Sequence, residues 1–244
     1  MSNYKVRFYK GDYRWRQRQA NRDRCVAYVE QHFNGAANRR AGYSMVIVGY
    51  RSSQTSRNWG RWYAQQIGKV FSVPVGGRRG IKVGGYGGRG NGNVKHTKMP
   101  AILLEPLFGS NPQHAEIIRS SAGQDKLAKV LADSIIEAFP KGGTVGFSVG
   151  HKYKSSRPWD RGVPIYGGGT EADYAEIVME KAKALLEGYD PSKVEEPKQE
   201  DDDKPDNDIR VIKDGKEIWL HTETDEDDNI LWDEENRVLY INTK

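Results

Sequence analysis

Hydrophobic residues recur along the chain with two different spacings, one typical of strands and one typical of helices. Short alternating or continuous apolar runs, which predict strands, lie at residues 4–9, 25–31, 44–50, 101–105 and 144–149. Apolar residues at helical spacing predict helices at residues 58–71 and 170–186. Residues 112–139 are expected to form one or two helices, and the polar, arginine-rich run at 13–24 is a further helix candidate. Strands that alternate with helices in this way predict an α/β fold, with a mostly parallel twisted sheet flanked by helices.

Two stretches interrupt this pattern. Residues 76–92 are rich in glycine and are expected to be too flexible to form a core element. The region after Glu187 holds three prolines and a run of Glu, Asp and Lys, which predicts a disordered linker. Beyond it, Asp214-Gly215 lies between two strand-like runs and predicts a hairpin. The expected division is a main domain at 1–187, a linker at 188–208 and a small β-rich module at 209–244.

Charge is distributed unevenly along the chain. The net charge is +5, but residues 1–187 carry +16 and residues 188–244 carry −11. A basic surface of this size attracts nucleic acid or other anionic polymers, or it is a solvated surface partly neutralised by the acidic tail. The single cysteine, Cys25, excludes an internal disulfide framework and a cysteine-rich zinc site. No apolar stretch is long enough for a transmembrane helix, and the first residues lack a secretory signal, so we expect synthesis in the cytoplasm.

Acidic and metal-binding side chains stand where predicted strands end. His32 and His151 each follow a predicted strand, Glu105 ends another, and Glu171 opens the last long helix. In open α/β sheets, sites form at the carboxyl ends of strands, so these side chains are candidates to converge. Their spacing alone leaves the matter open, since no local metal-ligand motif is present and single histidines are often structural. The remaining helix and module histidines, His114 and His221, are expected at the surface.

Several segments are similar to one known family. Residues 97–108 (Thr-Lys-Met-Pro-Ala-Ile-Leu-Leu-Glu-Pro-Leu-Phe), followed by Ser110-Asn111, resemble the C-terminal signature of zinc-dependent N-acetylmuramoyl-L-alanine amidases of the amidase-3 type, which include many phage endolysins. Residues 18–21 (Arg-Gln-Ala-Asn) and 28–34 (Tyr-Val-Glu-Gln-His-Phe-Asn) resemble its R-x-x-x-A-N helix and the S-I-H-A-N strand end that follows. Residues 79–82 (Arg-Gly-Ile-Lys) resemble its R-G-V-K segment.

The family's opening D-x-G-H-G signature is missing from the start of the chain and has a counterpart near the end of the main domain. Residues 148–151 (Ser-Val-Gly-His), 160–163 (Asp-Arg-Gly-Val) and 168–171 (Gly-Gly-Thr-Glu) resemble that first strand and its helix. The family order of His, Glu, His and Glu is met here by His32, Glu105, His151 and Glu171. This arrangement indicates a circular permutation, although two chains exchanging halves would leave the same pattern. The resemblance covers residues 4–187.

The chain also departs from the family pattern. The first position and the trailing glycine of D-x-G-H-G are replaced by Ser148 and Lys152, and the serine before the second histidine is replaced by Glu30-Gln31. A glycine-rich stretch, Gly84–Gly92, stands where the family has a strand-like segment. These differences bear on substrate contacts more than on the ligand set.

The resemblance implies a zinc hydrolase. His32, His151 and Glu171 would bind Zn²⁺ and leave one coordination position open, and the metal would lower the pKa of a water molecule toward about 7. Glu105 would take the proton of that water and pass it to the leaving amine. The substrate implied is peptidoglycan, cleaved between N-acetylmuramic acid and L-alanine.

Four further residues complete the expected site. Glu30 lies two residues before His32 on the same strand face, so it is either a hydrogen-bond partner that fixes the tautomer of His32 or a solvent-facing charge. Asn34 and Arg161 match polar cleft positions of the family and are expected to hold the muropeptide. His96 precedes the 97–108 signature and is expected at the rim of the cleft, where a plain loop histidine is the alternative.

Two other functions remain open from the sequence. A related zinc carboxypeptidase or endopeptidase would cut within the stem peptide. Alternatively, the arginines and glycines near Tyr86, together with the basic helix at 13–24, would suit a nucleic-acid-binding module without catalysis, although the amidase-like signatures make nucleic acid an unlikely partner.

The wider role implied by the resemblance is that of a phage or prophage endolysin. Such an enzyme is made in the cytoplasm, reaches the cell wall through a holin, and lyses it there. The basic main domain would suit anionic wall polymers. The module at 209–244 is expected to bind the wall, a partner subunit or the main domain itself.

Overall fold

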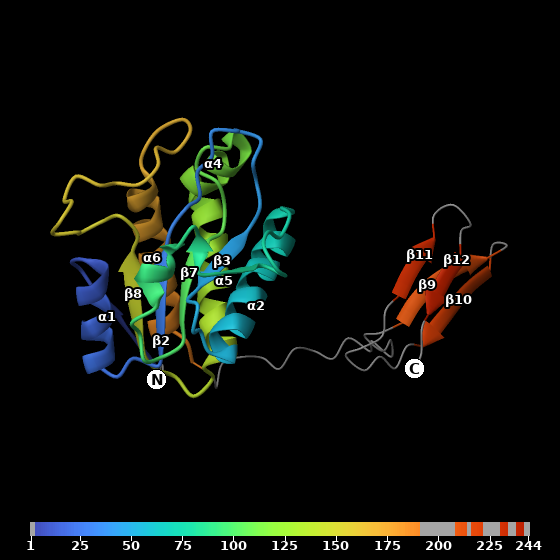
Figure 1. Cartoon of the computed structure of the whole chain (residues 1–244), viewed down its shortest axis with the longest axis horizontal. Coiled ribbons are helices and arrows are strands. Elements are labelled where there is room, and N and C mark those ends of the chain that lie inside the picture. The colour runs from blue at the N-terminus through green and yellow to red at the C-terminus, as the bar shows by residue number, and fades with distance from the viewer. Residues whose placement is uncertain (1–2, 191–207, 214–215, 222–229, 234–237, 242–244) are drawn as a thin grey trace. The chain divides into compact units, whose positions relative to one another are not determined.

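The computed structural model describes residues 3–190 and four strands of the C-terminal region, at 208–213, 216–221, 230–233 and 238–241 (Figure 1). The chain divides into two compact units, residues 1–192 and 193–244. Among the described residues, no helix is long and apolar enough to cross a membrane.

A six-stranded sheet forms the centre of the first unit (Figure 1). Its strands, in spatial order, are β1 (Tyr4–Phe8), β8 (Gly143–Val149), β2 (Ala27–Gln31), β7 (Ala101–Glu105), β3 (Met45–Val48) and β4 (Ile81–Val83). The first four are parallel to one another, β3 pairs antiparallel with β7, and β4 pairs parallel with β3. The expected mixed α/β fold with a mostly parallel sheet is therefore confirmed.

Helices cover both faces of this sheet. On one face lie α2 (Gln54–Phe71), α5 (Ser121–Ala138), which follows α4 (Pro112–Arg119), and α6 (Glu171–Glu187). On the other face lie α1 (Tyr13–Arg22) and the short α3 (Asn91–Val94). Side chains of one strand alternate between two cores, so that Val29 belongs to the larger core and Tyr28 to the smaller one. Every second residue of β2 therefore faces α1 and α3.

The glycine-rich stretch contributes to the sheet, and the expectation that residues 76–92 contain no core element is wrong. Ile81, in β4, pairs with Val46 and is only 3% exposed. Gly80 has a φ of +90°, and a Cβ atom there would lie 2.7 Å from the Cβ of Ala64, so a glycine is needed to bring β4 this close to α2. The next residues form a small antiparallel ladder of β5 (Gly85–Tyr86) and β6 (Arg89–Gly90).

The order of the strands brings the ends of several strands together at one edge of the sheet. Although β8 is the last strand of the unit in sequence order, it lies between β1 and β2 in the sheet. The carboxyl ends of β8, β2 and β7 are therefore neighbours, and β3 begins beside them, with Met45 opposite Glu105. The carboxyl edge of such strands is where α/β folds place ligands.

The described residues of the second unit form two antiparallel pairs of strands. β9 (Asp208–Lys213) pairs with β10 (Lys216–His221), with Lys213 opposite Lys216, which confirms the expected hairpin. β11 (Ile230–Asp233) pairs with β12 (Val238–Ile241). The turn residues 214–215 and most of the predicted linker, residues 191–207, lie outside the described residues.

Candidate metal centre

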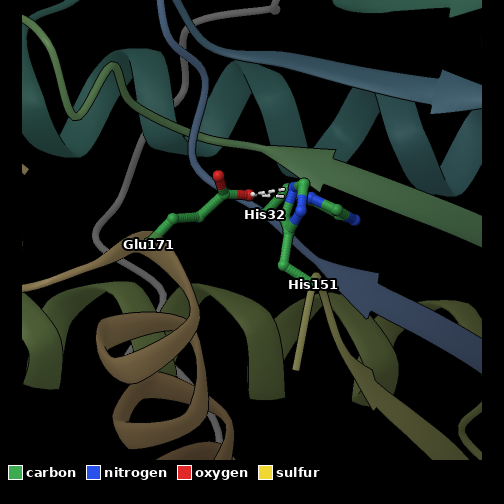
Figure 2. A group of neighbouring side chains, drawn as sticks. All are labelled: His32, His151 and Glu171. Atoms are coloured by element: carbon green, nitrogen blue, oxygen red, sulfur yellow. Dashed lines mark hydrogen bonds and ion pairs between the residues drawn. The ribbon is translucent and has the colours of Figure 1, made fainter. Parts of the chain in front are cut away.

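Three of the sequence-predicted residues meet at the carboxyl edge of the sheet. His32 follows β2, His151 follows β8, and Glu171 is the first residue of α6. One ligand atom from each lies within 4.8 Å of the other two (Figure 2). The two imidazole rings are 4.9 Å apart between centroids and nearly perpendicular, and the carboxylate of Glu171 points at both.

His32 is held between two carboxylates. Its Nδ1 lies 2.7 Å from Oε1 of Glu171, and its Nε2 lies 3.0 Å from Oε1 of Glu30. Burial lowers the pKa of His32, but the bonds to Glu171 and Glu30 outweigh it and raise the pKa to about 10. Glu30 is 1% exposed, so the solvent-facing alternative for this residue is wrong. A further hydrogen bond, from Oγ of Ser148 to Oε2 of Glu30 at 3.0 Å, fixes that carboxylate.

The carboxylate that holds the ring of His151 comes from a loop, whereas Glu30, which holds His32, lies on a strand. Its Nδ1 lies 2.7 Å from Oδ1 of Asp160, and its Nε2 lies 3.4 Å from Oε1 of Glu171. Asp160 also accepts hydrogen bonds from Lys154, at 2.7 Å, and from the backbone N–H of Gly162, at 3.0 Å. Burial raises the pKa of Asp160, and these bonds together with that of His151 outweigh it, so its pKa is lowered. The charged form of Asp160 is thus available to orient the ring of His151.

Glu171 presents Oε1 to the histidines, and both of its carboxylate oxygens accept hydrogen bonds from the backbone. Its Oε2 accepts from the N–H of Val163 at 2.9 Å, and its Oε1 lies 3.2 Å from the N–H of Phe33. Burial raises the pKa of Glu171, but the neighbouring His32 outweighs it and the pKa is lowered. Space around the carboxylate is tight, because a Cβ atom at Gly162 would lie 2.2 Å from Oε2. A glycine at this position lets the loop pass beside the carboxylate.

Glu105 adjoins this group from the neighbouring strand. The N–H of His32 donates to the carbonyl of Leu104 at 3.0 Å, which places Glu105 beside His32. Its Oε2 atom is buried and has no hydrogen-bond partner among the described residues. Burial raises the pKa of Glu105 to about 8, against an opposing effect of His32 and with a further increase from Glu171. A buried carboxyl oxygen without a partner is an incomplete polar environment, which a water molecule or a substrate would complete.

The three residues predicted to bind substrate, Asn34, Arg161 and His96, have different surroundings. Asn34 lies two residues after His32, and its Oδ1 accepts from the N–H of Gly35 at 2.8 Å. Arg161 is paired with Asp173 and lines a surface cavity of about 780 Å³. His96 is exposed, and its backbone is held by Gln17 and Asn21 of α1; among the described contacts none joins it to the group. The binding roles of Asn34, Arg161 and His96 stay predictions.

Sequence reasoning misplaced one histidine. His114 is 6% exposed, and its Nδ1 accepts a hydrogen bond from the N–H of Phe108 at 3.1 Å, so the expectation of a surface residue is wrong. Its helix, α4, is short and its hydrophobic pattern did not mark position 114 as buried. His221 lies in β10, and its side chain is outside the described residues.

Three contributors to the site were not singled out from the sequence. Asp160 was part of a quoted motif, but only the loop conformation brings it to His151. Asn93 of α3 donates to Oε1 of Glu30. Arg16 lies on the buried face of α1 and is 1% exposed. The sequence did hold a signal for Arg16. In the pattern R-x-x-x-A-N the arginine stands four residues before the alanine. Since the alanine here is Ala20, the arginine of the pattern is Arg16 and not Arg18.

The donor set suits a zinc ion. Two imidazole nitrogens and one carboxylate oxygen are common protein ligands of catalytic Zn²⁺. Each imidazole has its second nitrogen on a carboxylate, Glu30 or Asp160, an arrangement that fixes the tautomer and raises ligand basicity. The nitrogens left for a metal are Nδ1 of His32 and Nε2 of His151, both facing Glu171.

Comparison with solved structures finds proteins of limited similarity. The catalytic domain of CwlV, an N-acetylmuramoyl-L-alanine amidase from Bacillus (Paenibacillus) polymyxa var. colistinus, is 22% identical, with a TM-score of 0.44, over 53% of this chain and 66% of that chain. An N-acetylmuramoyl-L-alanine amidase from Clostridium difficile 630 is 20% identical, with a TM-score of 0.45, over the same shares, 53% and 66%. The catalytic domain of the CD27L endolysin targeting Clostridia difficile is 20% identical, with a TM-score of 0.37, over 51% and 62%. The chain thus spans slightly less than two thirds of these structures.

No curated protein matches the chain. A model of the amidase-3 family, described as N-acetylmuramoyl-L-alanine amidase, matches residues 4–137. This segment is more than half of the chain, and it contains His32 and Glu105, whereas His151 and Glu171 follow it. The chain therefore belongs to the amidase-3 family of N-acetylmuramoyl-L-alanine amidases.

Proposed function

We propose that the protein is a zinc-dependent N-acetylmuramoyl-L-alanine amidase, which hydrolyses the amide bond between N-acetylmuramic acid and L-alanine in peptidoglycan. The observation that carries this proposal is the convergence of His32, His151 and Glu171 beside the unpartnered carboxyl oxygen of Glu105. Membership of the amidase-3 family supports the choice of substrate and bond.

In this proposal His32, His151 and Glu171 hold the metal, and Glu30 and Asp160 orient the two imidazoles. Zinc, when bound, would supply a Lewis acid that makes water a nucleophile near neutral pH. The carboxyl group of Glu105 takes a proton from the attacking water and returns it to the nitrogen of the leaving L-alanine. Burial raises the pKa of Glu105 to about 8, and a bound metal cation would lower it toward neutrality, where a carboxyl group both accepts and donates protons.

We also propose that the catalytic unit is a circular permutation of the family's order. Within the unit, the strand before His151 comes last in sequence, yet it lies between β1 and β2. The rings of Tyr4 and Tyr189 are in edge contact, with centroids 5.9 Å apart, so the start of β1 lies beside the chain leaving α6. A chain running β8, α6, β1 would therefore need only a short connection there, and such close ends are what permits permutation.

The biological setting follows as a further part of the proposal. We propose an endolysin-like role in lysis of the cell wall, after synthesis in the cytoplasm and release through a holin. Residues 1–187 would be the catalytic domain, 188–208 a linker, and 209–244 a module that binds the wall or another subunit. Anionic wall polymers are candidate partners of the basic catalytic domain, since residues 1–187 carry a net charge of +16.

The test is digestion of purified peptidoglycan by the full-length protein, with and without a chelator. We expect new free amino groups on L-alanine, no new reducing sugar ends, loss of release with the chelator, and recovery with Zn²⁺. His32→Ala is the matched variant and should release no amine even with added Zn²⁺. New amines on another stem residue would contradict the amidase assignment and indicate a zinc peptidase. No release by folded, zinc-loaded protein on several wall chemotypes would overturn the proposal and favour a binding function, nucleic acid included.

A further inference from the structure

A buried arginine contacts residues that hold both histidines of the candidate metal centre. Arg16 of α1 is 1% exposed, and all three of its guanidinium nitrogens donate hydrogen bonds. Nε donates to the carbonyl of Gly11 at 2.5 Å, Nη1 donates to Oγ of Ser148 at 2.6 Å and to the carbonyl of Val149 at 2.8 Å, and Nη2 donates to the carbonyl of Lys152. Burying a charge is costly unless the charge is paired and hydrogen-bonded. The hydrogen bonds of Arg16 and the nearby carboxylate of Glu30 meet that requirement.

Two of these bonds hold the turn that carries His151. The carbonyls of Val149 and Lys152 lie on either side of this residue, and both accept from Arg16. His151 has a φ of +61°, in the left-handed region that non-glycine residues rarely adopt. Such a backbone conformation persists only when the surrounding structure enforces it. The two bonds from Arg16 provide that enforcement, because they fix the chain before and after the strained residue.

A chain of hydrogen bonds also connects Arg16 to His32. Oγ of Ser148 accepts from Arg16 and donates to Oε2 of Glu30 at 3.0 Å, and Oε1 of Glu30 is bound to Nε2 of His32. The guanidinium of Arg16 itself is 4.0 Å from the Glu30 carboxylate, where its charge balances that of the buried acid. A single side chain is thereby connected to both histidines through different routes.

We propose that Arg16 is a positioning residue that sets the placement of the two histidine ligands relative to each other. The inference rests on the proposed function, in which His32 and His151 bind zinc. It extends that function by naming a residue that touches neither the metal nor the substrate. Lysine cannot replace it, since an ammonium group lacks the planar fork that reaches Ser148, Val149 and Lys152 at once.

The experiment measures zinc affinity of the full-length protein by competition with a chromogenic chelator, at a temperature where every variant is folded. Arg16→Lys is expected to lower the affinity about tenfold, as loss of an outer contact to a metal ligand does. Ser148→Ala interrupts only the route to Glu30 and is expected to lower the affinity less. Arg14→Lys, on the exposed face of the same helix, is the matched control and should leave affinity unchanged.

A second readout distinguishes positioning from simple stabilisation. The visible absorption spectrum of the Co²⁺-loaded protein reports ligand geometry, and it should change in Arg16→Lys but not in Arg14→Lys. A lower melting temperature with zinc affinity within twofold of the unmodified protein and an unchanged Co²⁺ spectrum would overturn the proposal. If Arg16→Lys does not fold, unchanged affinity in Ser148→Ala overturns it instead. Failure of the proposed metal site is a separate result, since the unmodified protein itself would then bind no zinc.

Discussion

The two halves of the candidate metal centre are built differently. His32 follows a buried central strand, is 7% exposed, and is bound to Glu30, a residue of that same strand. His151 lies on a turn with a positive φ, its side chain is 28% exposed, and it is bound to Asp160 on a loop. Both histidines have the same kinds of neighbours, with one ring nitrogen on a carboxylate and the other facing Glu171.

This difference shows where rigidity comes from in each half. In the strand half, ladder hydrogen bonds fix the backbone, and alternation places Glu30 and His32 on one face. In the loop half, the backbone is fixed by side-chain contacts, those of Arg16 and the bonds that Asp160 receives from Lys154 and Gly162. Changes in the strand half should therefore cost more than equivalent changes in the loop half.

The largest effect is expected for Glu105→Gln, in the strand half. The amide keeps the shape of the side chain but accepts no proton, so we expect kcat to fall about 10³-fold, within the range of general acid–base catalysis. Zinc affinity should stay within a few-fold of the unmodified protein, because Glu105 is not among the three ligand residues. The measurement is release of L-alanine amines alongside metal titration. Retention of most of the activity would contradict the role of Glu105.

Glu30→Gln is expected to have the next largest effect, on metal binding. The buried carboxylate would be replaced by a neutral amide, which leaves Arg16 without its balancing charge and weakens the hydrogen bond to His32. We expect zinc affinity to fall about 100-fold, the upper end of the effects seen for outer contacts to metal ligands. Chelator competition measures it. An effect below threefold would show that His32 needs no carboxylate partner.

Asp160→Asn makes the corresponding change in the loop half. Because Asp160 is more exposed than Glu30, water can replace part of what the carboxylate provides, and we expect a fall of about tenfold in zinc affinity. The same competition assay applies, so the ratio between the two variants tests the comparison directly. Equal losses in Glu30→Gln and Asp160→Asn would break it, since burial would then make no difference to the worth of the carboxylate.

Elements and residues of the strand half were easier to predict from the sequence than those of the loop half. The apolar run Ala101–Glu105 gave β7 at its observed bounds, and α6 was placed within one residue, since both have strong hydrophobic patterns. Residues at strand ends, such as His32 and Glu105, are candidates because topology brings strand ends together, and the family resemblance singles them out. Asp160 was not singled out, because its approach to His151 depends on a loop with an uncommon backbone angle, which no periodicity encodes.

Short elements without periodicity were missed for a related reason. β4 has only three residues, Ile81–Val83, inside a glycine-rich run. Its place in the sheet depends on the approach of Gly80 to α2 and on pairing with β3, both of which are contacts between distant parts of the chain. Local composition favoured a flexible loop, and tertiary contacts overrode it.

His114 extends the comparison to a second buried histidine, one without a carboxylate partner among the described residues, and gives the smallest predicted effect. Burial lowers the pKa of His114, whereas that of the equally buried His32 is raised by its two acids. A histidine whose pKa is lower in the folded protein binds fewer protons there than in the unfolded chain, so its contribution to stability is present above pH 6.5 and is lost as the pH falls below it. Between pH 7.5 and 5.5 the free energy of unfolding should therefore decrease through this residue. Urea unfolding at both pH values, in the unmodified protein and in His114→Gln, measures it, and the variant should show a smaller decrease. Because the other titrating groups are common to both proteins, an identical decrease in the two would show that His114 is protonated in the folded state despite its burial.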